Sequence, residues 1–366
     1  MYKIIISFII FIHGIIHLLG FVKAFQIGQI SQLTKHISKP VGIAWLLSCL
    51  LFLLLSYLYF NSNKYWWAIA FVSILLSQIL IIAYWHDAKF GTIANLLILF
   101  ISIPAFSSWM FYQSYLNDLK NQSNQTAYFD SSILSESDIA HLPELIKKYL
   151  QYTKVIGKPK VNQFYVSFKG QIRKNEQSDW MPFTSEQNNF LSSPTRLFYM
   201  RAVMKNLPVD GYHHYIEGKA CMDIRLLSLV KVQYMEGAIM DKAETVTFFN
   251  DMCLMAPSTL IDPRITWLET IDQKIKASFT FNDMTIFAWL YFNNEGALIN
   301  FSSSDRYNAD VGQNLEWLTP VNAYSEINGM NLATKADAAY RYTDGDQVYG
   351  QFEMTGLQYN QTKMGY

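Results

Sequence analysis

Two histidines near the start of the chain have a spacing that could support chemistry. His13 and His17 are four residues apart, so a helix would place both rings on one face. Together they could hold a metal ion or a haem, or pass protons, because ionisable groups within apolar helices are often functional. The alternative is a pair of neutral imidazoles that hydrogen-bond to neighbouring helices. Two ligands do not complete a metal site, so no metal is assigned and His13 and His17 are only weak candidates.

Polar residues in the second half of the chain could contact a ligand. His213 and His214 are adjacent, and since consecutive strand residues face opposite sides, at most one of them enters a pocket. Asp305 and Arg306 follow a strand-like run, and could lock a loop or present a guanidinium to an anion. Arg201 lies in the apolar run LFYMRAVM and therefore needs a partner or water. It is a candidate for holding an anionic head group.

The common catalytic and nucleotide-binding signatures are missing from the sequence. There is no GxSxG, P-loop, strand-linked GxGxxG, HExxH or DxDxDG pattern. The cysteines Cys49, Cys221 and Cys253 form no CxxC or Cys/His cluster, and the sequence leaves open whether the last two pair. We therefore assign no catalytic residue and expect no cofactor, and an enzyme is not the favoured interpretation.

Four long apolar stretches fill the first part of the chain. They cover residues 4–22, 41–60, 65–85 and 90–111, and each is long enough for the roughly 20 helical residues that cross a bilayer. Residues 1–112 are thus predicted to be a multi-pass membrane bundle. The loops on one side carry four lysines against three on the other. Because positive loops stay in the cytoplasm, this favours an extracytoplasmic C-terminal domain.

The net charge of zero hides a difference between the two halves. Residues 1–110 carry six lysines against the single acid Asp87, which gives +5, so the remainder carries −5. A mildly acidic globular half excludes nucleic acid as a partner, since such proteins need a basic surface. The basic half suits a lipid bilayer. The oligomeric state is not indicated.

The rest of the chain reads as a polar linker at 113–140 and a β-rich domain at 141–366. Many short alternating runs separated by turn residues favour an antiparallel sheet, and a sheet of about ten or more strands must curl or close. One helix is predicted at Asp241–Met255, with Asp241 as N-cap and Glu244 completing a capping box. The predicted fold is an α-helical four-span bundle followed by an α+β domain with a large curved, half-barrel-like antiparallel sheet and about two helices.

Aromatic residues on both faces of the predicted strands suggest what this sheet could bind. The chain has 9 Trp, 23 Tyr and 25 Phe. They could belong to a sheet covered on each side, or line a groove for a lipid or acyl chain. The predicted ligand-binding residues are Trp180, Phe198, Arg201 and Trp289.

Several ordered motifs resemble an uncharacterised family of bacterial proteins. The motifs are Leu142–Gly157, Trp180-Met181-Pro182-Phe183 with Gln187, Leu207-Pro208-Val209 with Gly211, and Asp305-Arg306-Tyr307. That family carries a domain of unknown function behind membrane helices, and the resemblance covers about residues 140–360. It implies no functional residues. The curled sheet is also similar, at the level of fold, to that of periplasmic lipoprotein carriers.

These observations favour a membrane-anchored binding module for a lipid, a lipoprotein acyl chain or another apolar ligand. One alternative is a membrane-bound enzyme or redox partner that uses His13 and His17. The other is a structural or assembly factor that docks another envelope protein.

Overall fold

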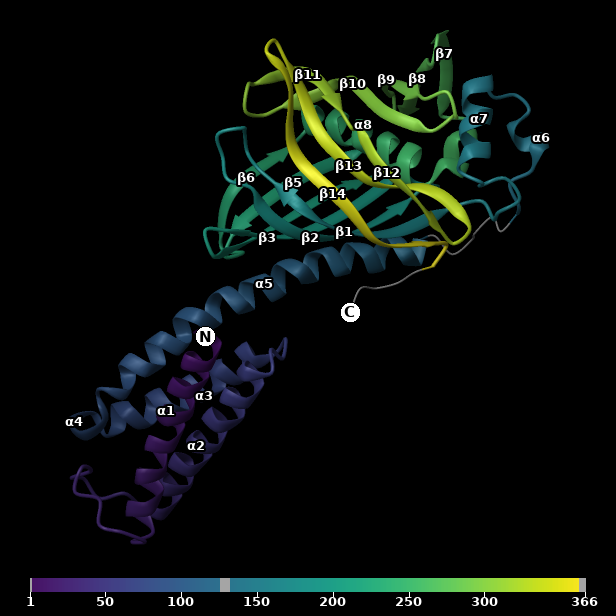
Figure 1. Ribbon diagram of the computed structural model, residues 1–366. Helices are drawn as coiled ribbons and strands as arrows, with labels where there is room; N and C mark the ends of the chain where they lie inside the picture. Colours follow the sequence, from purple (N-terminus) through teal and green to yellow (C-terminus); the bar gives the residue numbers. More distant parts are fainter. Residues whose placement is uncertain (1, 126–131, 362–366) are drawn as a thin grey trace. The chain divides into compact units, whose positions relative to one another are not determined.

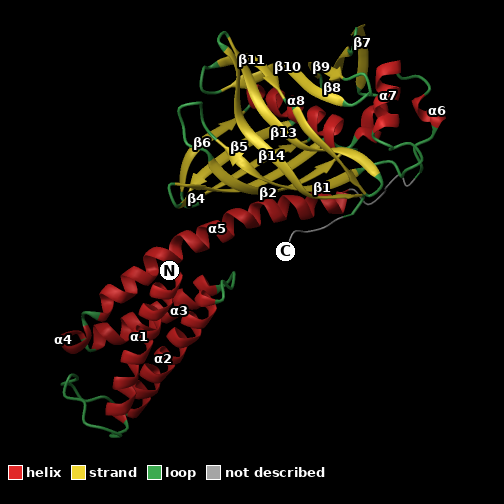
Figure 2. Ribbon diagram, viewed as in Figure 1, coloured by secondary structure: helices red, strands yellow, loops and turns green. Residues whose placement is uncertain are grey.

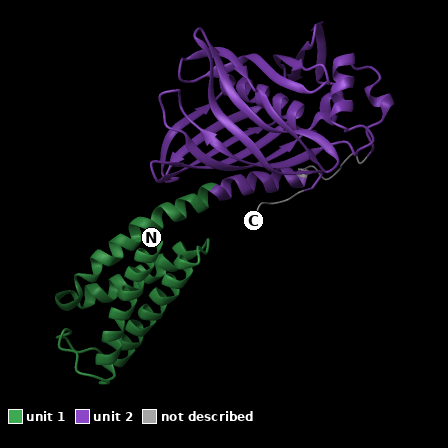
Figure 3. Ribbon diagram, in the orientation of Figure 1, with its two compact units in different colours: residues 1–111 green, residues 112–366 purple. Residues whose placement is uncertain are grey.

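The computed structural model describes residues 2–125 and 132–361. The chain forms two compact units, Met1–Phe111 and Tyr112–Tyr366 (Figure 3). The first is helical and the second contains a large sheet (Figure 2). The predicted fold class is therefore confirmed.

Long apolar helices make up the first unit. They are α1 (Tyr2–Ala24), α2 (Lys39–Phe60), α3 (Trp66–Ala83), the short α4 (Trp85–Ala88) and the first part of α5 (Gly91–Gln125). Among the described helices, α1, α2, α3 and α5 are long and apolar enough to cross a membrane. Large side chains such as Leu75 and Phe100 are exposed on them, as expected of helices that contact lipid rather than water.

Helix α5 extends further than the sequence suggests. Residues 113–125 of the predicted linker are helical, and from Tyr112 onward they belong to the second unit. Tyr115 and Leu119 are fully buried there, and Asn188 Nδ2 donates to Tyr115 Oη at 2.7 Å. Their spacing of four residues gives this polar segment an apolar stripe, which explains why the helix continues. The linker's residues 126–131 lie outside the described part of the chain.

One antiparallel sheet of 14 strands forms the body of the second unit (Figure 1). The strands are β1 (Gln163–Ile172), β2 (Met181–Phe190), β3 (Thr195–Met204), β4 (Leu207–Ile216), β5 (Lys219–Leu226), β6 (Val230–Glu236), β7 (Ile265–Ile271), β8 (Lys274–Phe281), β9 (Met284–Phe292), β10 (Leu298–Asn308), β11 (Gln313–Leu318), β12 (Val321–Ile327), β13 (Met330–Tyr342) and β14 (Gly345–Tyr359). Their order is β6-β5-β4-β3-β2-β1-β14-β13-β11-β10-β9-β8-β7, and β12 pairs with β13. Since β1 pairs with β14, the first and the last strand of the domain are neighbours in the middle of the sheet.

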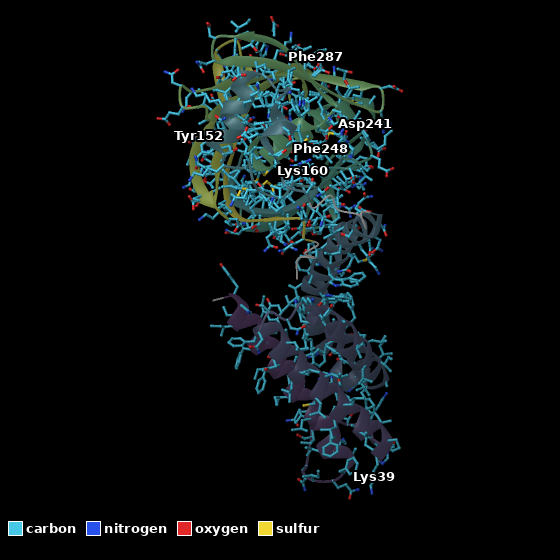
Figure 4. All side chains as sticks on the ribbon, turned by 90° about the vertical axis from the view of Figure 1, so that its right-hand side faces the viewer. Lys39, Tyr152, Lys160, Asp241, Phe248 and Phe287 are labelled. Carbon is cyan, nitrogen blue, oxygen red and sulfur yellow. The ribbon has the colours of Figure 1, made fainter. Side chains whose placement is uncertain are left out.

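Helix α8 (Ala238–Met255) lies on the concave side of the curved sheet (Figure 1). It is buried around nearly its whole circumference, and Phe248 lies in the interior of the domain (Figure 4). The short helices α6 (Glu136–Ile139), α7 (Glu144–Tyr152) and η1 (Pro257–Ile261) complete the unit. The hydroxyl of Tyr149 on α7 donates to the Cys253 carbonyl on α8 at 2.7 Å, which ties the two helices together.

The predicted start of the α8 helix is wrong by three residues. The helix begins after Gly237, whose φ of 91° is a conformation that glycine adopts without steric cost. Asp241 is therefore inside the helix and does not cap it. Its carboxylate accepts hydrogen bonds from the backbone N–H of Ala220 at 2.7 Å and from Lys219 Nζ at 3.0 Å.

At β3 the sheet is covered on both faces, as the first interpretation of its aromatic residues predicted, whereas strands such as β6 and β7 are largely exposed. Phe198 faces the concave side, whereas Tyr199, the next residue, contacts Tyr112 and Tyr115 of α5. The three cysteines all lie in described residues, where each is buried and none forms a disulfide. A pair between Cys221 and Cys253 is therefore not present.

Candidate ligand-binding cavity

A cavity of about 710 Å³ lies between the concave face of the sheet and α8. Its walls come from β1 to β6, α8, and strands β10, β11, β13 and β14. The walls are mostly apolar and include Phe168, Met181, Phe198, Met200, Ile224 and Phe352.

Side chains alternate between the two faces along each strand, and this alternation determines which residues face the cavity. On β3, Phe198, Met200 and Ala202 line the cavity, and the intervening residues point to the other face. The register then places His213 of β4 beside Phe198, and Met222 of β5 beside His213. Neighbouring strands thus contribute matching inward positions, which makes a continuous wall.

Methionine is the commonest apolar residue of this wall. Eight of the 14 methionines in the chain line the cavity, and they are Met181, Met200, Met204, Met222, Met235, Met240, Met255 and Met354. Because methionine is unbranched, flexible and polarisable, it adapts to irregular apolar shapes. A wall of this composition suits an apolar ligand of variable shape better than one rigid molecule.

A cluster of buried charges is embedded in the same cavity. Arg196 on β3 donates from Nε to Asp251 Oδ2 at 2.8 Å, and from Nη1 to Glu244 Oε2 at 3.2 Å. Gln187 accepts from Arg196 Nη2 at 3.1 Å and donates to Asp251 Oδ2 at 2.7 Å. Both carboxylates come from α8, so this cluster joins the helix to the sheet.

Arg306 on β10 is the second cation of the cluster. Its Nη1 donates to the Ala243 carbonyl at 3.0 Å and to the Thr247 hydroxyl, and its Nη2 lies 3.7 Å from Glu244 Oε1. The guanidinium stacks on Trp317, 4.4 Å from the ring centroid. Two arginines therefore balance the two carboxylates, Glu244 and Asp251. A balanced cluster of this kind avoids the cost of an unpaired buried charge.

The cavity changes the pKa values of its titratable groups in different directions. Burial raises the pKa of Asp251 even though Arg196 opposes this shift. Burial acts in the same way on Glu244, but Arg196 and Arg306 outweigh it and lower the pKa of that carboxyl. Burial lowers the pKa of His213 to about 4, with nearby Arg196 and Arg306 adding to the shift and Glu244 opposing it. His213 is therefore neutral at physiological pH.

The structure separates the four residues that the sequence predicts to bind ligand. Phe198 lines the cavity. Arg201 faces the other side of β3, where Nη1 donates to Glu186 Oε1 at 3.0 Å and the guanidinium stacks on Tyr112. The other two predicted residues do not line the cavity, although Trp180 contacts Arg173, which does. Trp289 stacks with Lys274. Any role of these three in binding stays a prediction.

The charged residues of the cavity were missed or read differently from the sequence. Glu244 fitted a capping box, and Arg306 fitted either a locked loop or a guanidinium presented to an anion. Arg196 had a usable signal, because it is two residues from Phe198 and therefore on the same face of the strand.

The two histidines of α1 have hydrogen-bond partners within the first unit. His13 Nε2 lies 3.0 Å from Asn95 Oδ1, and His17 Nε2 lies 2.8 Å from Ser77 Oγ. This is the arrangement expected if the rings hydrogen-bond to neighbouring helices. In residues 2–125 and 132–361, no three His, Cys, Asp or Glu side chains lie close enough to hold a metal ion.

The protein combines four helices that are long and apolar enough to cross a membrane with a domain whose curved sheet contains a cavity. Residues 132–352 match the family model described as a family of unknown function (DUF6544). This match covers more than half of the chain, so the chain belongs to that family. The predicted membership of an uncharacterised family is confirmed. No curated protein matches the chain significantly.

Solved structures show a partial likeness to this chain. A domain assigned to an outer membrane lipoprotein-sorting protein from Vibrio parahaemolyticus is 10% identical, with a TM-score of 0.33 over 56% of this chain and 87% of that one. A DUF1329 family protein from Desulfovibrio piger is 11% identical, with a TM-score of 0.33 over 63% and 94%. A LolA superfamily protein from Nitrosomonas europaea is 9% identical, with a TM-score of 0.30 over 63% and 95%. Because these TM-scores are too low to support an inference about function, the function has to be inferred from the cavity itself.

Proposed function

We propose that the protein is a membrane-anchored binding module for a lipid, an acyl chain or another apolar ligand, at the outer side of the bacterial inner membrane. The observation that carries this proposal is the apolar cavity of about 710 Å³ between the sheet and α8. Ligand sites typically have volumes of about 300–1,000 Å³, apolar walls and a few polar groups. The cavity has all three properties.

The first unit supports the membrane part of the proposal. Its four long apolar helices provide an anchor, and the distribution of lysines between their loops favours an extracytoplasmic second unit. Lipids are the most abundant apolar molecules at a membrane, so an anchored cavity of this kind would have a constant supply of ligand.

Two neighbouring residues of β3 give a matched test. Ala202 is 3% exposed and lines the cavity, whereas Val203 is 47% exposed and points to the other face. Ala202→Trp fills cavity space with an indole ring, and Val203→Trp adds the same ring outside it. We expect the full chain, purified in mild detergent, to release bound lipid on solvent extraction. Ala202→Trp should release several-fold less, and Val203→Trp as much as the wild type.

Mass spectrometry of the extracts measures this outcome, and thermal unfolding verifies that both variants fold. The proposal is wrong if the wild-type chain carries no lipid and also fails to bind a fluorescent fatty acid saturably. Equal lipid contents in the two variants would likewise show that lipid binds elsewhere.

A further inference from the structure

The buried titratable groups of the cavity wall form one cluster, whereas other charged lining residues such as Lys174, Glu176 and Asp310 are exposed. Arg196, His213, Glu244, Asp251 and Arg306 all line the cavity, and ion pairs connect the two arginines to the two carboxylates. Charged groups in an otherwise apolar cavity are costly to bury, and they are found where a site must recognise a polar group. The cavity thus has a polar region within apolar walls, which is the pattern that an amphipathic ligand requires.

Two nitrogen atoms of this region have no hydrogen-bond partner within the described residues. They are Arg306 Nε and His213 Nε2. Both side chains line the cavity, although the two nitrogen atoms themselves are buried. Native proteins rarely leave buried polar atoms unpaired, because this destabilises the folded state. A ligand atom that accepts a hydrogen bond would satisfy Arg306 Nε, which can only donate.

The geometry points to a site for the oxygen end of an acyl chain, with Arg306 and His213 contacting the carboxylate or ester carbonyl and the methionine-rich wall contacting the chain. This inference rests on the proposed function, since it names the ligand class of the same cavity. The two arginines are already balanced by Glu244 and Asp251, so the site does not require a negative charge on the ligand. A free fatty acid and an esterified lipid or lipoprotein both offer the required oxygen.

Three ligands with the same chain length separate these possibilities. Hexadecanoate carries a charged oxygen pair, methyl hexadecanoate an uncharged carbonyl, and hexadecane no oxygen. Each is used to displace a fluorescent fatty acid from the detergent-purified full chain. A hydrogen bond of ordinary strength corresponds to roughly threefold to tenfold in affinity. We expect at least one oxygen-bearing ligand to bind better than hexadecane by about this factor.

Substitutions then assign the preference to the two residues. His213→Leu removes a ring with an unpaired nitrogen, so it should leave the folded state at least as stable while reducing the preference for oxygen. Arg306→Lys keeps the charge near Glu244 but removes the Nε donor, and should have the same effect on binding. The control Arg264→Lys changes an arginine that also pairs with a carboxylate and stacks on a phenylalanine, outside the cavity lining. It should leave the preference unchanged.

The outcomes distinguish the two proposals. If none of the three ligands displaces the probe, the apolar site itself is wrong. If hexadecane displaces it as well as both oxygen-bearing ligands do, the cavity is apolar but the oxygen site is wrong. A preference that survives both His213→Leu and Arg306→Lys also overturns the assignment. A preference for hexadecanoate alone supports a free fatty acid, and equal affinity for the methyl ester supports an esterified lipid.

Discussion

Arg196 and Arg201 show how the two faces of one strand differ energetically. The Arg196 side chain is 9% exposed and holds two buried carboxylates, whereas that of Arg201 is 45% exposed and pairs with Glu186. Removing one partner of a buried ion pair leaves an uncompensated charge. The same removal at an exposed pair costs little, because water replaces the partner.

We therefore expect Arg196→Leu to lower the free energy of unfolding by about 3–5 kcal/mol. Arg201→Leu should cost about 1 kcal/mol or less. Denaturant titration of the detergent-purified chain, followed by tryptophan fluorescence, measures both. Similar losses in the two variants would contradict the assignment of Arg196 to the interior.

His213 should make the second unit sensitive to acid. Its pKa is about 4 in the folded protein and about 6.5 when unfolded, so the unfolded chain binds the proton first as the pH falls. The folded state consequently loses stability between pH 6.5 and pH 4, and His213 has no such effect above pH 6.5. Each pKa unit corresponds to about 1.36 kcal/mol, so the loss approaches roughly 3 kcal/mol.

His213→Leu should therefore flatten the decline in melting temperature over this pH range. The exposed His141 provides the control, since His141→Gln should leave the decline as it is in the wild type. A decline in His213→Leu that is as steep as in the wild type would assign the acid sensitivity to other groups.

At the scale of the elements, features that have a local sequence pattern could be predicted from the sequence. Features that depend on tertiary contacts could not. The first three spans are continuous apolar runs, and their predicted ends lie within two residues of those of α1, α2 and α3, whereas α5 continues to Gln125. The concave face of the sheet has no local signal, because Phe198 and Tyr199 are both apolar and both buried. Arg201 was predicted because of the apolar run around it, and Arg196 was not considered. The start of α8 was misplaced because the spacing of Asp241 and Glu244 imitates a capping box, while Gly237 sets the actual start.

The pairing of β1 with β14 is the contact that joins the first and last strands of the sheet. A Cβ atom added at Gly170 of β1 would lie 1.9 Å from the Gln351 carbonyl oxygen on β14. This carbonyl belongs to the backbone and cannot move away alone, so the strands would have to separate locally. At Gly211 of β4, the nearest atom to an added Cβ is a methionine methyl carbon at 3.5 Å, which is an ordinary contact.

We expect Gly170→Ala to destabilise the second unit by roughly 2 kcal/mol or more, as steric overlap in a buried element does. Gly211→Ala should be neutral, or stabilise by up to about 1 kcal/mol, because it reduces the entropy of the unfolded chain. Chemical denaturation of both variants checks the difference. Equal stabilities would mean that the β1–β14 pair can shift at little cost.

At the scale of the whole molecule, the two structural units also differ in net charge. Residues 1–110 carry a formal charge of +5 and the remainder −5. Lysines in the short loops between spans determine orientation, whereas acidic residues contribute little. We therefore expect a few lysines of the first unit to determine the orientation, although the second unit contains the proposed site.

The loop between α1 and α2 is the decisive region for orientation. It contains Lys35, with Lys23 and Lys39 at the adjoining helix ends. If this loop is cytoplasmic, four spans place the C-terminus outside.

Alkaline phosphatase, which is active only outside the cytoplasm, should then be active when fused to the C-terminus and inactive when fused after Lys35. Replacing Lys23, Lys35 and Lys39 with glutamine should reduce the activity of the C-terminal fusion, because it removes the charge difference. An inactive C-terminal fusion, together with an active fusion after Lys35, would place the second unit in the cytoplasm, and the ligand would then come from the inner leaflet.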